Sequence, residues 1–154
     1  DSVTNFGVIT ANEVSNVGEQ GIQLAGGNGT IDNNDITNAD TINDINRGGI
    51  RLRDGASANL GNVSVVSNTI TNSYNGVVIR PTTNVTSTVN VNNNNLIGNA
   101  NAGFYHGGSG NAIDATNNWW DDITGPVVGG TGRNAIAGVS AGLVNANPFS
   151  TAVL

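Results

Sequence analysis

A short phrase returns five times along this chain: an apolar residue, two residues that are mostly small or polar, an asparagine and, two positions later, a second apolar residue. The asparagines are Asn12, Asn34, Asn68, Asn94 and Asn118. The preceding apolar residues are Ile9, Ile31, Val65, Val91 and Ala115, and the following ones are Val14, Ile36, Ile70, Leu96 and Trp120. Self-similarity at a period in the twenties indicates a solenoid, in which each repeat packs mainly on its neighbours.

A second phrase, a glycine followed by alternating residues, trails the first in four of the repeats. It covers Gly21–Leu24, Gly49–Leu52, Gly76–Ile79 and Gly103–His106. Period-two alternation is typical of a strand, so each repeat is built from strands rather than helices. We therefore expect an all-β chain of about five stacked coils, with neighbouring strands about 4.8 Å apart.

The five asparagines predict a corner in each coil, because the apolar residues on either side are not in strand alternation across them. Asparagine tolerates left-handed backbone angles, and its amide bonds nearby main chain. In a stack of coils these side chains form a ladder along the axis. In the fourth repeat Asn95 is an alternative anchor, because it brings Ile97 and Asn99 into the pattern but loses Val91.

Composition limits the classes of partner that this chain is expected to bind. The chain has 154 residues, which suits one domain, and its formal net charge is −6 with five arginines and no lysine. Nucleic acid and anionic membrane both favour a basic surface, so we expect neither as the main partner. No apolar run is long enough for membrane insertion, and the absence of cysteine excludes a disulfide framework and thiolate metal sites.

The phrases resemble those of right-handed parallel β-helix repeat proteins, the pectate-lyase-like superfamily. Residues 113–126, which contain Asn117-Asn118-Trp119-Trp120 and Gly125-Pro126, resemble the last coil of many secreted surface proteins. The resemblance implies a single right-handed parallel β-helix over residues 1–154, with stacked coils in 1–111 and a last coil and capping tail in 112–154. It also implies an extracellular or cell-surface location. Asp121 stands where the motif has glycine.

The resemblance implies that a lyase on this fold uses acidic residues to hold Ca²⁺ and a basic residue to remove the proton alpha to a uronate carboxylate. Only side chains that point out of the strands could serve. The densest basic and aromatic group expected there comprises Arg51, Arg53, Arg80 and Tyr105, with Asp54 beside them. Paired guanidinium contacts suit a carboxylated sugar. The alternative is that these arginines bridge local acids such as Asp54. Trp119 is a further candidate for stacking on a sugar ring, or a structural residue.

Carboxylates gather on another predicted face. Glu13 is expected beside Asp35 in neighbouring coils, with Asp32 diagonally near. Two or three carboxylates in register suit Ca²⁺ or a glycosidase pair. The alternative is an ordinary acidic surface, and we expect no other cofactor.

Alternation places the only histidine, His106, among inward residues, which favours a core role over a general base. Trp120 is expected to fill the last inward position. Three sequons for N-glycosylation occur at Asn28, Asn62 and Asn84.

These patterns favour a non-catalytic structural or adhesive module. Asp1–Gly7 is too short to cover an open coil, so we expect the N-terminal coil to contact an upstream β-helix segment or a neighbouring copy stacked head to tail. A polysaccharide lyase or glycosidase, and a module that binds polysaccharide without cleaving it, stay open as alternatives.

Overall fold

The computed structural model describes residues 6–154, and Asp1–Asn5 lie outside the described part. The described chain is all-β apart from one short 3₁₀ segment, η1 (Ala141–Leu143). Most of its strands belong to three parallel sheets, called here A, B and C.

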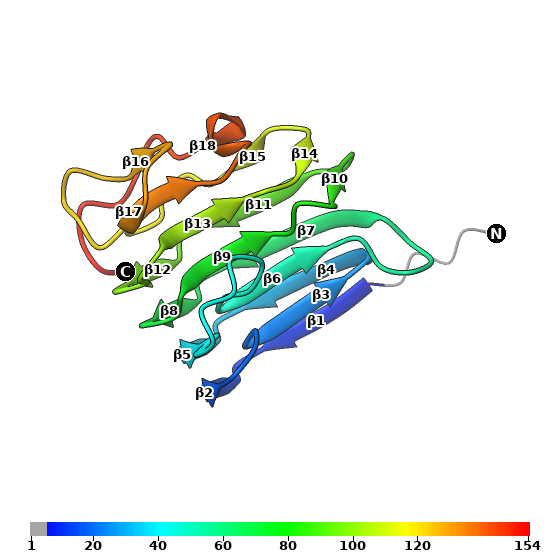
Figure 1. Cartoon of the computed structure of the whole chain (residues 1–154), viewed down its shortest axis with the longest axis horizontal. Coiled ribbons are helices and arrows are strands. Elements are labelled where there is room, and N and C mark those ends of the chain that lie inside the picture. The colour runs from blue at the N-terminus through cyan, green and yellow to red at the C-terminus, as the bar shows by residue number, and fades with distance from the viewer. Residues whose placement is uncertain (1–5) are drawn as a thin grey trace.

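Each sheet takes one strand from each of the first four repeats (Figure 1), and sheets A and C continue beyond them. Sheet A has the order β1 (Phe6–Thr10), β4 (Gly27–Asp32), β7 (Leu60–Val66), β11 (Val89–Asn92), β15 (Ile113–Asp114), β18 (Val144–Asn145). Sheet B has the order β2 (Glu13–Val17), β5 (Asp35–Ala39), β8 (Thr69–Thr71), β12 (Asn95–Ile97). Sheet C has the order β3 (Ile22–Ala25), β6 (Ile50–Arg53), β9 (Asn75–Ile79), β13 (Ala102–His106), β17 (Gly132–Ala137), β16 (Val127–Val128). A small parallel pair joins β10 (Asn84–Val85) to β14 (Ser109–Gly110).

Parallel register follows the sequence repeat. Ile9 pairs with Ile31, which pairs with Val65 on β7, and Val65 pairs with Val91 on β11. On sheet B the column that begins at Val14 continues through Ile36 and Ile70 to Leu96. The prediction of an all-β chain with parallel sheets is confirmed, and this arrangement is compatible with a β-helix.

The core lies between the three sheets and consists of their inward columns. Ile31, Ile36, Ile50, Val65 and Ile70 are at most 1% exposed. Burying such side chains contributes roughly 1.5–3 kcal/mol each before chain entropy is subtracted. At the C-terminal end Trp120 is fully buried, in the inward position that the repeat predicted for it.

The two ends of the stack differ. At the N-terminal end four inward side chains of the first repeat, Ile9, Val14, Val17 and Leu24, are only partly buried against the core, although Ile22 is 6% exposed. At the C-terminal end the chain departs from sequential order, because β16 precedes β17 in sequence but lies beyond it in sheet C. The tail after β17 continues over the last repeat, where β18 pairs with β15.

The corner between sheets A and B places the left-handed backbone one residue earlier than the asparagine pattern suggested. The residues with φ between +53° and +59° there are Ala11, Asn33, Ser67, Asn93 and Asn117, each directly before a ladder asparagine. The ladder residues themselves keep their amides free to bond across repeats. Asp121, which replaces the motif glycine, also has a positive φ of 61°, a conformation that aspartate tolerates better than most residues.

Candidate functional site

The five asparagines are joined by hydrogen bonds from one repeat to the next, and we call them the asparagine ladder. The side-chain nitrogen of Asn34 donates to Oδ1 of Asn68 at 2.9 Å, and that of Asn68 donates to Oδ1 of Asn94 at 3.0 Å. The backbone N–H of each donor residue bonds the same oxygen, at 2.9 Å in both cases. The four asparagines from Asn34 to Asn118 are at most 2% exposed.

Each ladder amide also bonds main-chain carbonyls. The side-chain nitrogen of Asn68 donates to the oxygens of Ile31 and Val66, both at 2.9 Å. A buried amide with all its groups paired stabilises a corner, whereas an unpaired one would cost about 1–3 kcal/mol. The ladder therefore has a structural function, since its donors and acceptors are used within the stack.

A second, shorter polar series lies inside the structure and was missed by the sequence reasoning. The N–H of Ala39 donates to Oγ of Ser73 at 3.2 Å, and the N–H of Ser73 donates to Oδ1 of Asn99 at 3.1 Å. Asn99 donates in turn to the oxygen of Ile70 at 3.1 Å. These residues occupy one column five positions after each ladder asparagine, so the spacing could have revealed them.

The arginines gather on the outer face of sheet C. The column Gln23, Arg51, Val78, Tyr105 is in register, as predicted. Arg51 donates to Oε1 of Gln23 and of Gln20, both at 3.2 Å, and Arg53 donates to Oε1 of Gln23 at 3.1 Å. Burial, together with the neighbouring charges of Arg80 and Arg53, lowers the pKa of Arg51.

Carboxylates do not neutralise this arginine cluster, which we define as Arg51, Arg53 and Arg80. Within residues 6–154 the ion pairs involve Arg47 and Arg133 instead. The carboxylate of Asp54 accepts from the N–H groups of Leu60 and Asn84, and Arg53 reaches only the main-chain oxygen of Asp54. Nε of Arg51 is buried and has no hydrogen-bond partner in the described chain. The cluster is thus a local concentration of positive charge on an acidic protein.

The two aromatic candidates lie apart. Tyr105 is 9% exposed and packs in a small apolar cluster with Val78 and three alanines beside the arginines. Trp119 is partly exposed and pairs with Asn95 next to sheet B, on a different face. The structure therefore does not bring Trp119 together with the arginine cluster.

The acidic candidates form a pair rather than a cluster. Glu13 and Asp35 are exposed and directly paired in register, while Asp32 lies on sheet A. No group of three or more metal-ligating side chains suited to an ion occurs in the described residues. Calcium binding here stays a prediction, with the Glu13–Asp35 pair as its geometric support.

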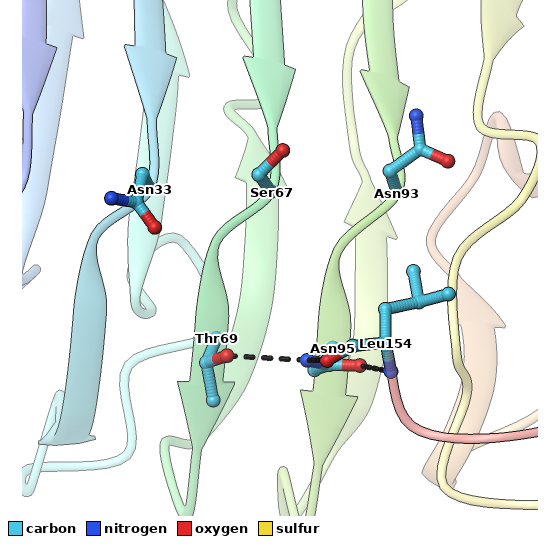
Figure 2. Close-up of a pocket in the computed structure, with 6 residues that line it drawn as sticks. All are labelled: Asn33, Ser67, Thr69, Asn93, Asn95 and Leu154. Carbon is cyan, nitrogen blue, oxygen red and sulfur yellow. Dashed lines mark hydrogen bonds between the residues drawn. The ribbon is translucent and has the colours of Figure 1, made fainter.

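A polar groove follows the corner between sheets A and B and encloses about 360 Å³. Figure 2 shows its lining in two rows, which consist of Asn33, Ser67, Asn93 and of Thr69, Asn95, with Leu154 at one end. Asn95 pairs with the main chain of Leu154 in both directions, accepting from its N–H at 2.8 Å and donating to its oxygen at 3.0 Å. The carboxyl-terminal residue thus occupies part of the groove.

Two titratable groups are buried. Alternation predicted an inward His106, and its exposed fraction is 0%. Both ring nitrogens lack a hydrogen-bond partner in residues 6–154, and burial lowers the pKa of His106 to about 4. Asp40 is 1% exposed, and burial raises its pKa although its Oδ1 accepts from the N–H of Asp44 at 3.1 Å.

The sequon asparagines lie on the surface of sheet A and of the β10–β14 pair. Oδ1 of Asn28 accepts from the N–H of Asn62 at 2.8 Å, and Oδ1 of Asn62 accepts from the N–H of Thr88 at 3.0 Å. Asn84 is exposed, and Oγ of Ser109 lies 3.3 Å from its Oδ1. Glycosylation at these residues stays a prediction.

Comparison of the chain with protein-family models, with curated proteins and with solved structures finds no match in any of the three. Among residues 6–154, no helix is long and apolar enough to cross a membrane.

Proposed function

We propose that this chain is a right-handed parallel β-helix of about five coils with a C-terminal cap, and that it serves as a non-catalytic structural or adhesive module at the cell surface or outside the cell. The repeat register and the asparagine ladder support the β-helix. The resemblance of residues 113–126 to the last coil of secreted surface proteins supports the location.

The observation that carries the structural role is the N-terminal end of the stack, where residues 6–154 place no strand beyond β1, β2 and β3. Strands β1, β2 and β3 are the terminal strands of sheets A, B and C. Such edges expose unpaired N–H and C=O groups, which favour pairing with a further strand. Four apolar side chains of this repeat, Ile9, Val14, Val17 and Leu24, are only partly buried, whereas Ile31 and Ile36 one repeat later are fully buried. An end of this kind suits a module that joins another β-structure.

The titratable groups favour this role over catalysis. A general base needs access to its substrate and a pKa near the working pH. His106 is wholly buried, with its pKa lowered to about 4, so it does not meet this requirement. The lyases that the repeat resembles use a basic residue as the base, so the arginine cluster is the place at which catalysis has to be tested.

Incubation with acidic and neutral polysaccharides tests the non-catalytic role. We expect neither unsaturated products that absorb in the ultraviolet nor new reducing ends, with and without Ca²⁺. Product formation that the Arg53→Ala and Arg80→Ala variants abolish would establish a polysaccharide-degrading enzyme instead.

A second candidate function is binding of a carboxylated polysaccharide without cleavage, and the arginine cluster supports it. Guanidinium groups bind carboxylates in paired contacts, and here no carboxylate of the described chain occupies them. The test is binding of polygalacturonate to the parent, to Arg80→Gln and to Arg133→Gln as a control of equal charge change. This function requires that Arg80→Gln weaken binding about tenfold and Arg133→Gln much less. Equal loss in both variants would indicate a nonspecific charge effect.

A further inference from the structure

We propose that the N-terminal end of the stack is covered by another parallel β-repeat that carries an asparagine in the ladder position, and not by the C-terminal end of a second copy. This inference rests on the proposed structural function and specifies its partner. It follows from the direction of the hydrogen bonds in the ladder and from the residue that ends the ladder at the other side.

The ladder has a fixed direction. Each asparagine donates from its backbone N–H and its side-chain nitrogen to Oδ1 of the asparagine one repeat later. Asn12 follows the rule, with its N–H 3.0 Å and its side-chain nitrogen 2.8 Å from Oδ1 of Asn34. Oδ1 of Asn12 has no donor within residues 6–154, and Asn12 is exposed. A repeat placed before β1 would complete the series by donating to this oxygen.

The apolar part of the end requires the same partner. Ile9, Val14, Val17 and Leu24 stand over Ile31, Ile36, Ala39 and Leu52 in register. The four residues of the second repeat are at most 1% exposed because a repeat lies on each side of them. A repeat placed before β1 would bury the four residues of the first repeat in the same way, with its strands pairing to β1, β2 and β3.

The C-terminal end does not offer a side-chain donor in this position. Ile113 pairs with Val144 and Asp114 with Asn145, so Ala115 stands opposite Ala146. The N–H of Ser150 donates to the oxygen of Asn118 at 2.9 Å, as the N–H of Thr69 does to the oxygen of Asn34, so Phe149 stands opposite Asn118. Phenylalanine therefore occupies the ladder position of the last layer and has no side-chain amide to donate. A second copy stacked head to tail would offer Oδ1 of Asn12 at most a backbone N–H, without the side-chain donor that the other steps of the ladder have.

The C-terminal end of the stack also lacks, in sheet C, an outermost strand as long as β3. Its outermost strand is β16, which has only two residues, Val127 and Val128. By contrast, β3 at the open end has four residues, Ile22 to Ala25. A continuous repeat of the same chain type supplies strands of the required length in all three sheets.

A grafted repeat tests the proposal. Residues 62–87 make one repeat, and the residue that follows them, Thr88, is equivalent to Phe6 through the register of β1, β4, β7 and β11. A copy of 62–87 placed directly before Phe6 therefore puts its own ladder asparagine against Asn12. The matched control is the same graft with that asparagine replaced by alanine. A second graft copies residues 28–61 in the same place.

The measurements are amide hydrogen exchange and sedimentation velocity, applied first to the unaltered chain over a range of concentrations. We expect a monomer in which the amides of β1 to β3 exchange about tenfold or more faster than those of β4 to β6. Either graft should slow exchange in β1 to β3 by about tenfold or more, and the alanine control should recover only part of that effect.

Three results would overturn the proposal. The first is head-to-tail assembly of the unaltered chain with concentration-dependent protection of β1 to β3. The second is a monomer whose β1 to β3 are already as protected as β4 to β6, because the end would then need no partner. The third is that neither graft protects β1 to β3. None of these results bears on the polysaccharide assay, so failure of this inference and failure of the non-catalytic role are distinguishable.

Discussion

The side-chain nitrogen of Asn68 lies 3.0 Å from Oδ1 of Asn94, while its own Oδ1 accepts two hydrogen bonds from Asn34. One amide group thus links three successive repeats. The link is short because the asparagines stand directly above one another at the corner, one residue after a left-handed backbone position.

Replacement of Asn68 by alanine should strongly destabilise the stack. The change removes an acceptor from Asn34 and a donor from the buried oxygens of Ile31 and Val66, so we expect a loss of roughly 3 kcal/mol or more. Urea unfolding followed by circular dichroism measures the effect.

Two further variants test whether the loss of stability is specific to the Asn68 amide. Asn90→Ala, at a partly exposed position whose side chain forms no hydrogen bond within residues 6–154, should change stability by less than about 0.5 kcal/mol. Asn68→Asp keeps the shape but places an oxygen against acceptors, so it should be as damaging as alanine at pH 7. Equal effects of Asn68→Ala and Asn90→Ala would mean that the ladder does not stabilise the fold.

Much of this architecture was accessible from the sequence because the repeat fixes strand register. Residues three before the ladder asparagine pair with one another, and so do those two after it. The sequence could not decide whether Asn94 or Asn95 is the ladder asparagine of the fourth repeat, because four asparagines follow one another there. The structure resolves it through contacts between repeats: Asn94 donates to Oδ1 of Asn118, whereas Asn95 faces outward and bonds Leu154.

The candidate sites were less predictable than the strands. Alternation correctly grouped Arg51 with Tyr105 on sheet C. However, Gln20, which accepts from Arg51, lies outside the predicted column, and the pairing of Asn95 with Leu154 joins residues 59 apart. Such contacts depend on how loops and the tail return to the surface, which no local period encodes. For the same reason the sequence did not predict that β16 lies beyond β17 in sheet C.

Gly49→Ala should destabilise the protein because the corner before sheet C has no space for a side chain. A Cβ there would overlap Cγ2 of Ile70 and lie 3.0 Å from the oxygen of Gly76. Forcing a methyl group into a packed site costs about 1–3 kcal/mol. Gly18→Ala is the control, since a Cβ at Gly18 would have no neighbour within 4 Å. Thermal unfolding should separate the two variants, and similar midpoints would disprove close packing at this corner.

Asp40→Asn should change how stability varies with pH. Burial raises the pKa of Asp40 above its ordinary value of 3.8. The folded protein therefore binds more protons at this group than the unfolded chain above pH 3.8, and the contribution of Asp40 to stability falls as pH rises through its folded pKa. The variant removes that loss, so its stability relative to the parent should increase between about pH 4 and pH 7.

Asp44→Asn provides a contrast of opposite sign. The N–H of Asn46 donates to the Asp44 carboxylate and lowers its pKa, so Asp44 stabilises the folded state above its unfolded pKa. Its replacement should lower relative stability as pH rises. Urea titrations at several pH values would measure both slopes, and slopes of the same sign would contradict this account of Asp40.

His106 should make the protein less stable in mild acid. The folded pKa is about 4 against an ordinary value of 6.5, so below pH 6.5 the unfolded chain binds a proton that the folded protein does not. The sign of this linkage makes stability fall as pH decreases from 6.5 to about 4, by roughly 3 kcal/mol in total. Below pH 4 both states carry the proton and the contribution levels off. His106→Leu fills the same buried position beside Phe104 without a titrating group, so its unfolding free energy should lose that part of the pH dependence. If parent and variant show the same slope between pH 6.5 and pH 4, the imidazole must be protonated or solvated inside the fold, which its 0% exposure opposes.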